Sequence, residues 1–185
     1  ETLTRHGYPI TPEQVLTRFL GVSDREARLT IEAEIGRGLP YDFEEEVKRA
    51  TLQFYANDLR PIANVGAAIA EIDLPKCVAS SGTPEKIRHG LTSAGLYDLL
   101  SPHIFSATQV SRGKPAPDLF LFAAEQMKTR SQRCIVIEDS VPGIAGAIAA
   151  GMPVLGFHGG SHCPPGYDDR LRAAGLSDAD VLSAT

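Results

Sequence analysis

The sequence predicts an α/β protein, with a helix-covered parallel sheet preceded by a small bundle of helices. From residue 65 onward, short apolar strands alternate with helical patterns, which is typical of a parallel sheet covered on both faces. Residues 1–58 instead contain helical patterns and little else. The 185 residues are 43% hydrophobic and 22% charged, which suits a globular chain with a sizeable core. We therefore expect a helical domain at 1–58, a hinge at 59–64 and an α/β domain at 65–185.

Three amphipathic helices are expected in the first domain. The first begins at Pro12 and ends at Gly21. Ser23 begins the second, where Ser23 and Glu26 have the spacing of a capping box. The third and longest begins after Asp42. Helices joined by such short links pack as a small bundle.

The second domain is expected to alternate strands with helices. Strands are predicted at 76–80, 104–110, 134–137 and 153–157, and helices at 65–72, 84–94, 117–127 and 141–150. Cys77 and Cys134 lie in apolar strand segments, so we interpret both as small buried hydrophobic residues.

Composition excludes several classes of protein. The net charge is −5 and no basic stripe is present, which argues against a nucleic-acid partner. No apolar run approaches the roughly 20 residues of a membrane-spanning helix. The three cysteines form no Cys-x-x-Cys pair, so we do not expect a disulfide framework. We expect the protein to work in a reducing compartment. We predict a cytoplasmic monomer or weak dimer.

Three segments near predicted strand ends carry polar chemistry. Ser80, Ser81 and Gly82 separate a strand from a helix that starts near Pro84. Hydroxyls and free backbone N–H groups at a helix start suit a phosphate. An ordinary capped turn explains the same residues.

The other two segments supply charge. Lys114 precedes Pro115, which restricts its backbone and aims a point charge at an anion; a solvated loop lysine is the alternative. Glu138 and Asp139 end an apolar strand, and such adjacent carboxylates beside a phosphate site suggest Mg²⁺. A helix N-cap with a neighbouring acid is the alternative there.

Together, and in this order, these segments resemble the haloacid dehalogenase superfamily. The similar motifs are Ala-Ser-Ser-Gly at 79–82, Gly-Lys-Pro-Ala-Pro-Asp at 113–118 and Val-Ile-Glu-Asp-Ser-Val-Pro-Gly at 136–143. The subclass resembled includes β-phosphoglucomutase and many sugar-phosphate phosphatases. The resemblance implies a Rossmann-like core with a helical cap domain.

Roles follow from the resemblance, position by position. It implies that Ser80 binds the transferring phosphoryl group, with N–H groups of Ser81 and Gly82 assisting. It implies that Lys114 offsets developing charge as a catalytic residue. It also implies that Asp139 is a direct Mg²⁺ ligand and that Glu138 acts at the metal either directly or through water.

Arg25 lies in a loop that resembles the specificity loop of capped relatives. It could bind a second anionic group of a small phosphorylated metabolite, or be an ordinary solvated arginine. The resemblance also implies that the cap closes over the substrate.

The nucleophile of the family is not found. In the family an aspartate in an Asp-x-Asp-Gly motif, at the end of the first strand, becomes phosphorylated. The sequence contains no such motif. We therefore expect a fragment of a longer protein whose core lacks its first strand, and a degenerate, non-catalytic binding module is the alternative.

The favoured reaction is Mg²⁺-dependent hydrolysis of a sugar or sugar-acid phosphate. A phosphomutase on the same scaffold remains an alternative. Dehalogenation of 2-haloacids is disfavoured by the Glu138–Asp139 pair, because that reaction does not need Mg²⁺.

One further stretch contains metal-ligand residue types. His158, His162 and Cys163 lie within the glycine-rich residues 156–163. No companion ligand has an obvious spacing, so we expect a flexible loop near the mouth of the site rather than a metal centre.

Overall fold

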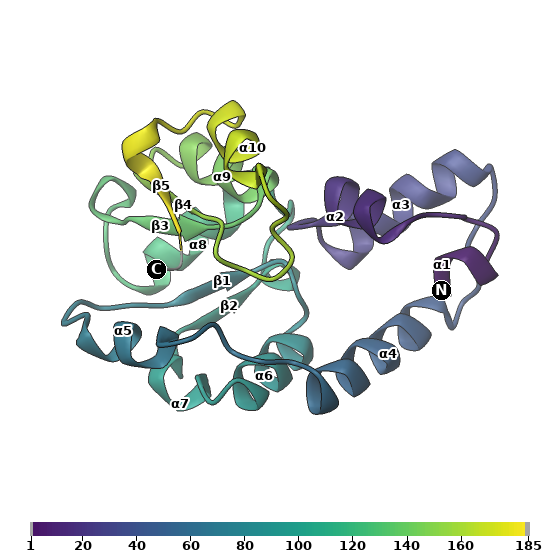
Figure 1. Ribbon diagram of the computed structural model, residues 1–185, viewed down its shortest axis with the longest axis horizontal. Coiled ribbons are helices and arrows are strands. Elements are labelled where there is room, and N and C mark those ends of the chain that lie inside the picture. The colour runs from purple at the N-terminus through teal and green to yellow at the C-terminus, as the bar shows by residue number, and fades with distance from the viewer. Residues whose placement is uncertain (1, 184–185) are drawn as a thin grey trace.

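The computed structural model describes residues 2–183, which form two lobes (Figure 1). The helical lobe consists of α1 (Thr2–Arg5), α2 (Pro12–Phe19), α3 (Asp24–Ile35) and α4 (Phe43–Asn57). The α/β lobe holds all the described strands. Helix α4 runs from the far end of the helical lobe back to α6 of the α/β lobe.

The helical lobe has its own small core. Tyr8, Ile31, Leu39 and Phe43 are buried together. Helix α3 begins as expected, because the Ser23 side chain accepts a hydrogen bond from the backbone N–H of Glu26. The three predicted helices are present. Side chains cap α2 and α3, whereas Asp42 makes no capping hydrogen bond at the start of α4. The apolar spacing of α4 was therefore the signal that located it.

The α/β lobe alternates its elements as predicted, with additions. Its elements are α5 (Val65–Glu71), β1 (Val78–Ser80), α6 (Pro84–Ser93), α7 (Tyr97–Leu100), β2 (Ile104–Ser106), η1 (Ala107–Gln109), α8 (Asp118–Gln126), η2 (Ser131–Arg133), β3 (Val136–Glu138), α9 (Val141–Ala149), β4 (Val154–Phe157), α10 (Tyr167–Ala173), η3 (Asp178–Asp180) and β5 (Val181–Leu182). Helices α7 and α10 and strand β5 were not anticipated.

The second predicted strand is shorter than expected. Strand β2 stops at Ser106, whose side chain caps the 3₁₀ turn that follows. A hydroxyl that hydrogen-bonds to the nearby backbone competes with the hydrogen bonds between strands. The prediction relied on the apolar residues of the segment and did not take this competition into account.

The strands form two separate parallel sheets. One pairs β1 with β2, and the other has the order β3-β4-β5. Ser80 pairs with Ser106 in the first sheet, and Glu138 pairs with Gly156 in the second. Within residues 2–183, β1 and β3 each have one paired edge and one unpaired edge.

Two predictions about burial were wrong. Cys77 is exposed and Cys134 is only partly buried. Ile135 and Ile137 are 66% and 59% exposed, although their segment was predicted to be a buried strand. Successive strand residues point to opposite faces: Val136 packs on the main core, whereas Ile135 and Ile137 point to the face that no described helix covers.

The main core lies beneath the second sheet. Its buried residues come from helices α8, α9 and α10, strand β4 and the connection between α9 and β4: Phe120, Ala124, Ile144, Ala147, Ala150, Met152, Val154, Tyr167 and Leu171. This core fixes the start of α9 and therefore the residues that link β3 to it. None of the helices formed by residues 2–183 has both the length and the apolar character needed to cross a membrane.

Candidate active site

The ends of β1 and β3 meet at one glycine of the helical lobe. Gly21 has a φ of +79°, and a Cβ atom there would lie 2.2 Å from Oγ of Ser140. The carbonyl oxygen of Gly21 accepts a hydrogen bond from Ser81 Oγ at 2.6 Å. Because Ser81 follows β1 and Ser140 follows β3, the carboxyl ends of both strands lie beside the same loop. That edge is where ligands bind in open α/β sheets.

The turn after β1 is organised by hydroxyl groups. Ser80 Oγ accepts a hydrogen bond from the backbone N–H of Gly82 at 3.2 Å. Ser106 Oγ donates to the carbonyl oxygen of Gly82 at 2.7 Å. Thr83 caps α6 by accepting from the N–H of Lys86. The turn is thus both an ordinary capped turn and a rigid start of a helix, a geometry that favours an anion.

Lys114 is buried in an ion pair. Only 5% of its side chain and 10% of the Glu138 side chain are exposed, and Lys114 Nζ lies 2.9 Å from Glu138 Oε2. The ammonium also lies 4.9 Å from the centre of the Phe120 ring. The alternative of a solvated loop lysine is therefore wrong. Burying an ammonium group is unfavourable without such a partner, so this charge is held in place.

Glu138 is held at both carboxylate oxygens. Ser140 Oγ donates to Oε1 at 2.5 Å while Lys114 binds Oε2. A Cβ atom at Gly143 would lie 2.0 Å from Oε1, so only glycine allows the carboxylate to lie there. Ser140 in turn caps α9 through the N–H of Gly143. The N-cap alternative for this segment is correct, but the cap is Ser140 rather than either acid.

Asp139 is more open than its neighbour. Its side chain is 42% exposed, and its Oδ2 lies 3.1 Å from Nε2 of His162. Burial by itself would raise the pKa of Asp139, but the contact with His162 lowers that pKa below its ordinary value. The carboxylate is therefore ionised at neutral pH.

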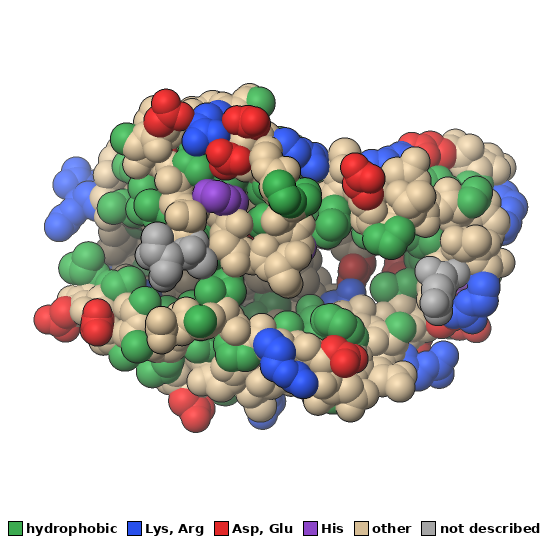
Figure 2. All heavy atoms as spheres, viewed as in Figure 1, with side chains coloured by type: hydrophobic (Ala, Val, Ile, Leu, Met, Phe, Trp, Pro, Cys, Tyr) green, Lys and Arg blue, Asp and Glu red, His purple; other side chains and the backbone are tan. Residues whose placement is uncertain are grey.

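A cleft of about 620 Å³ lies between the two lobes, beside this site. Figure 2 shows the opening, with acidic and basic side chains inside it. Ser81 and Gly113, next to the site, line it together with Arg25. Three other cations line it, and each is paired with a carboxylate: Lys48, Lys86 and Arg112. Among residues 2–183, no ion pair is found for Arg25.

Of the two adjacent acids, only Asp139 has a carboxylate oxygen that could bind Mg²⁺. Both oxygens of Glu138 are engaged, whereas no hydrogen bond to Oδ1 of Asp139 is found in the described part of the chain. In that same part, no three or more His, Cys, Asp or Glu side chains form a group that could hold a metal. Mg²⁺ commonly takes one or two carboxylates together with phosphate oxygens and water. Asp139 suits one such position.

Residues 156–163 contribute a side-chain contact to the site, between His162 and Asp139, which the sequence did not predict. His162 contacts Asp139, and His158 is not found in any side-chain ion pair or hydrogen bond among residues 2–183. The chain turns back at Gly160, whose carbonyl oxygen accepts from the N–H of Cys163.

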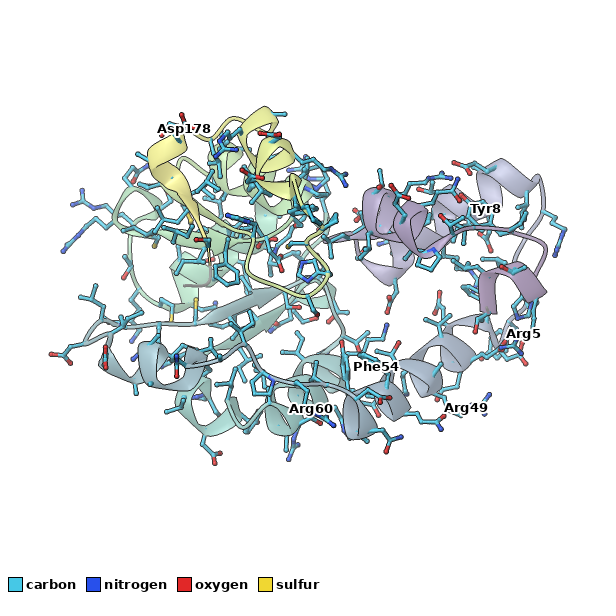
Figure 3. All side chains as sticks on the ribbon, in the orientation of Figure 1. Arg5, Tyr8, Arg49, Phe54, Arg60 and Asp178 are labelled. Atoms are coloured by element: carbon cyan, nitrogen blue, oxygen red, sulfur yellow. The ribbon has the colours of Figure 1, made fainter. Side chains whose placement is uncertain are left out.

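An Asp-x-Asp spacing occurs once in the chain, away from the site. Asp178 and Asp180 lie in η3, directly before β5. They therefore lie at the amino ends of the parallel strands, opposite the site. Figure 3 shows Asp178 at the outer end of the α/β lobe, far from the helical lobe, and its carboxylate binds Arg172.

The chain is similar to known hydrolases of one family. Residues 4–151 match the family model described as haloacid dehalogenase-like hydrolase. A 6-phosphogluconate phosphatase of Escherichia coli is 32% identical over 160 residues, which is 86% of this chain and 72% of the relative. Hexitol phosphatase A of the same organism is 28% identical, covering 86% of this chain and 73% of the relative.

A solved structure shares the fold. It is a conserved haloacid dehalogenase-like protein of unknown function from Agrobacterium tumefaciens, with a TM-score of 0.76 and 36% identity. The match covers 97% of this chain and 81% of that one. The Rossmann-like α/β architecture is therefore confirmed. With the family model covering most of its length, the chain belongs to the haloacid dehalogenase-like hydrolases.

Proposed function

We propose that the protein is a Mg²⁺-dependent phosphatase that hydrolyses the phosphate monoester of a sugar or sugar acid. One observation supports this most directly. A buried lysine, an exposed and ionised aspartate and a hydroxyl-rich helix start lie at one edge of the sheets, next to a cleft. Membership of the hydrolase family and the phosphatases among the relatives point the same way.

The attacking aspartate is proposed to come from a further strand between β1 and β3. The unpaired edges of β1 and β3 support this placement, since a strand there would pair the backbone groups of both edges. Its carboxylate would form the bond to phosphorus as the bond to the sugar oxygen breaks. Water would then hydrolyse the aspartyl-phosphate to release phosphate.

The residues of this chain would position and stabilise the phosphoryl group. Ser80, Ser81 and Gly82 would donate hydrogen bonds to its oxygens from the start of α6. Lys114 would offset the charge that develops on those oxygens, and Glu138 would keep its ammonium in place. Such preorganised groups need little rearrangement during the reaction.

Asp139 would be the metal ligand of this chain, and Glu138 would act indirectly. When bound, Mg²⁺ supplies positive charge against the phosphoryl oxygens and orients the ester. The helical lobe, residues 1–58, is proposed to act as the cap, joined to the core through the hinge at 59–64, and to exclude bulk water from the cleft.

Arg25 supports the choice of a sugar acid. It is exposed on the cleft without an ion pair among residues 2–183, unlike the other cations there. A carboxylate on the substrate, several carbons from its phosphate, would give Arg25 a partner. We therefore expect the protein to prefer an acid such as 6-phosphogluconate over the neutral sugar ester glucose 6-phosphate.

The test measures turnover of both esters by the complete protein with Mg²⁺. We expect Asp139→Asn to abolish turnover of both while the fold remains intact. Arg25→Gln should raise KM for 6-phosphogluconate about tenfold, because one exposed charge-assisted hydrogen bond to the substrate is lost. KM for glucose 6-phosphate should change little. Arg49→Gln is the control, because Arg49 is exposed on α4 and does not line the cleft. Full activity of Asp139→Asn would contradict the metal assignment.

A further inference from the structure

The loop at 159–163 is built around one histidine. A Cβ atom at Gly160 would lie 2.5 Å from Cε1 of His162, so the imidazole ring lies directly on the backbone of that glycine. The turn is closed by the hydrogen bond from the N–H of Cys163 to the carbonyl oxygen of Gly160 at 2.9 Å. The absence of a side chain at Gly160 thus permits one particular position of the ring.

That position places the ring against Asp139. Nε2 of His162 is buried and lies 3.1 Å from Oδ2 of Asp139, without the alignment of a full hydrogen bond. It has no other hydrogen-bond partner in residues 2–183. A buried ring nitrogen is costly to leave without a partner. The Asp139 carboxylate is the polar group that lies close enough to interact with it.

The backbone of Asp139 is held from the same side. The hydroxyl of Tyr167 donates to the carbonyl oxygen of Asp139 at 2.9 Å. Tyr167 is buried, and burial raises its pKa to about 12, so the hydroxyl stays protonated. The rings of His162 and Tyr167 meet edge to face with centroids 6.3 Å apart. Two aromatic side chains from the segment after β4 therefore hold Asp139 at two points.

We propose that His162 is a positioning residue for Asp139: it holds Oδ2 so that Oδ1 is presented to the metal ion. The inference rests on the proposed function, because it needs Asp139 to be a metal ligand. Groups that orient a metal-binding carboxylate commonly change metal affinity by 10–100-fold when removed. Glu138 is oriented by Lys114 and Ser140, and His162 would do the same for the neighbouring acid.

The experiment measures Mn²⁺ binding to the complete protein, without substrate, from the electron paramagnetic resonance signal of the free ion. His162→Ala should weaken Mn²⁺ binding about tenfold or more. His162→Gln should recover most of the affinity, because its amide can place an N–H donor near the position of Nε2. His158 directly follows β4 and forms no side-chain hydrogen bond or ion pair with Asp139 among residues 2–183, so His158→Ala should bind like the wild type.

Three results would overturn the inference. If Asp139→Asn loses Mn²⁺ while His162→Ala binds normally, the metal site stands and His162 has no role in it. If His162→Ala and His162→Gln are weakened equally and both melt earlier without metal, the role of His162 is structural only. If Asp139→Asn itself binds Mn²⁺ normally, the metal site of the proposed function is wrong, and the inference falls with it.

Discussion

The ion pair inside the α/β lobe and the ion pairs that join the two lobes differ chiefly in burial. Lys114 and Glu138 are almost completely removed from solvent. Lys86 of α6 binds Asp24 of α3 at 2.7 Å, but the Asp24 side chain is 46% exposed. Burial increases both the attraction between charges and the cost of leaving one alone, whereas exposed pairs contribute little. The α/β lobe therefore holds the Lys114 charge rigidly, whereas the ion pair between Lys86 and Asp24 is easily broken.

The largest effect is expected at the buried pair. Lys114→Met leaves the Glu138 carboxylate buried without a cation, which should lower the free energy of unfolding by about 3–5 kcal/mol. Turnover should fall about a hundredfold or more, because a charge-stabilising donor is lost. Urea unfolding and phosphatase assays measure the two effects separately.

The double variant Lys114→Met with Glu138→Gln separates stability from catalysis. It should regain most of the stability, since neither buried charge remains, but none of the turnover. Recovery of turnover together with stability would mean that Lys114 has only a structural role.

The next effect is expected at Gly143. A Cβ atom there would overlap the Glu138 carboxylate, at 2.0 Å from Oε1. Gly143→Ala should displace the Glu138 carboxylate and so weaken its ion pair with Lys114. We expect a large fall in kcat and only a small fall in the free energy of unfolding. Gly90→Ala on α6 is the control, because its Cβ would meet Tyr55 at an ordinary 3.4 Å and a helical Gly→Ala change favours the helix by about 1 kcal/mol. Equal kcat in the two variants would contradict this account.

A smaller effect is expected where the lobes meet. Gly21→Ala introduces a Cβ atom 2.2 Å from Ser140 Oγ and strains a φ of +79°. The helical lobe should separate from the strand ends, raising KM and the radius of gyration measured by small-angle X-ray scattering. Gly36→Ala carries the same type of strain, with a φ of +68° and open space around it. A change of KM in both variants would assign the effect to backbone strain rather than to the contact.

The smallest effect is expected for the exposed pair between the lobes. Asp24→Asn removes the partner of Lys86 and should cost less than about 1 kcal/mol. The difference in melting temperature from the wild type should shrink as salt is added, because salt screens exposed charges. A large loss that salt does not reduce would mean that this pair, like Lys114–Glu138, is effectively buried.

The sequence by itself determined the order of the elements other than α7, α10 and β5, and the places of the polar groups along the chain. Caps and apolar spacing located the helices that begin near Pro12 and Ser23. Short apolar segments between helical patterns located β1 and β3. Pro115 directed attention to Lys114 because it restricts the backbone before a helix, and Glu138 and Asp139 were noticed because they end an apolar strand. These features are local, so a single sequence is sufficient to show them.

Only the tertiary structure decided how those groups interact. It paired Lys114 with Glu138, left Asp139 open and brought His162 from a distant loop onto Asp139. It also left Ile135 and Ile137 exposed, because the burial of a strand depends on its neighbours and not on its own composition. Contacts between residues far apart in the chain arise from packing, and a pattern of nearest neighbours in the sequence does not contain them.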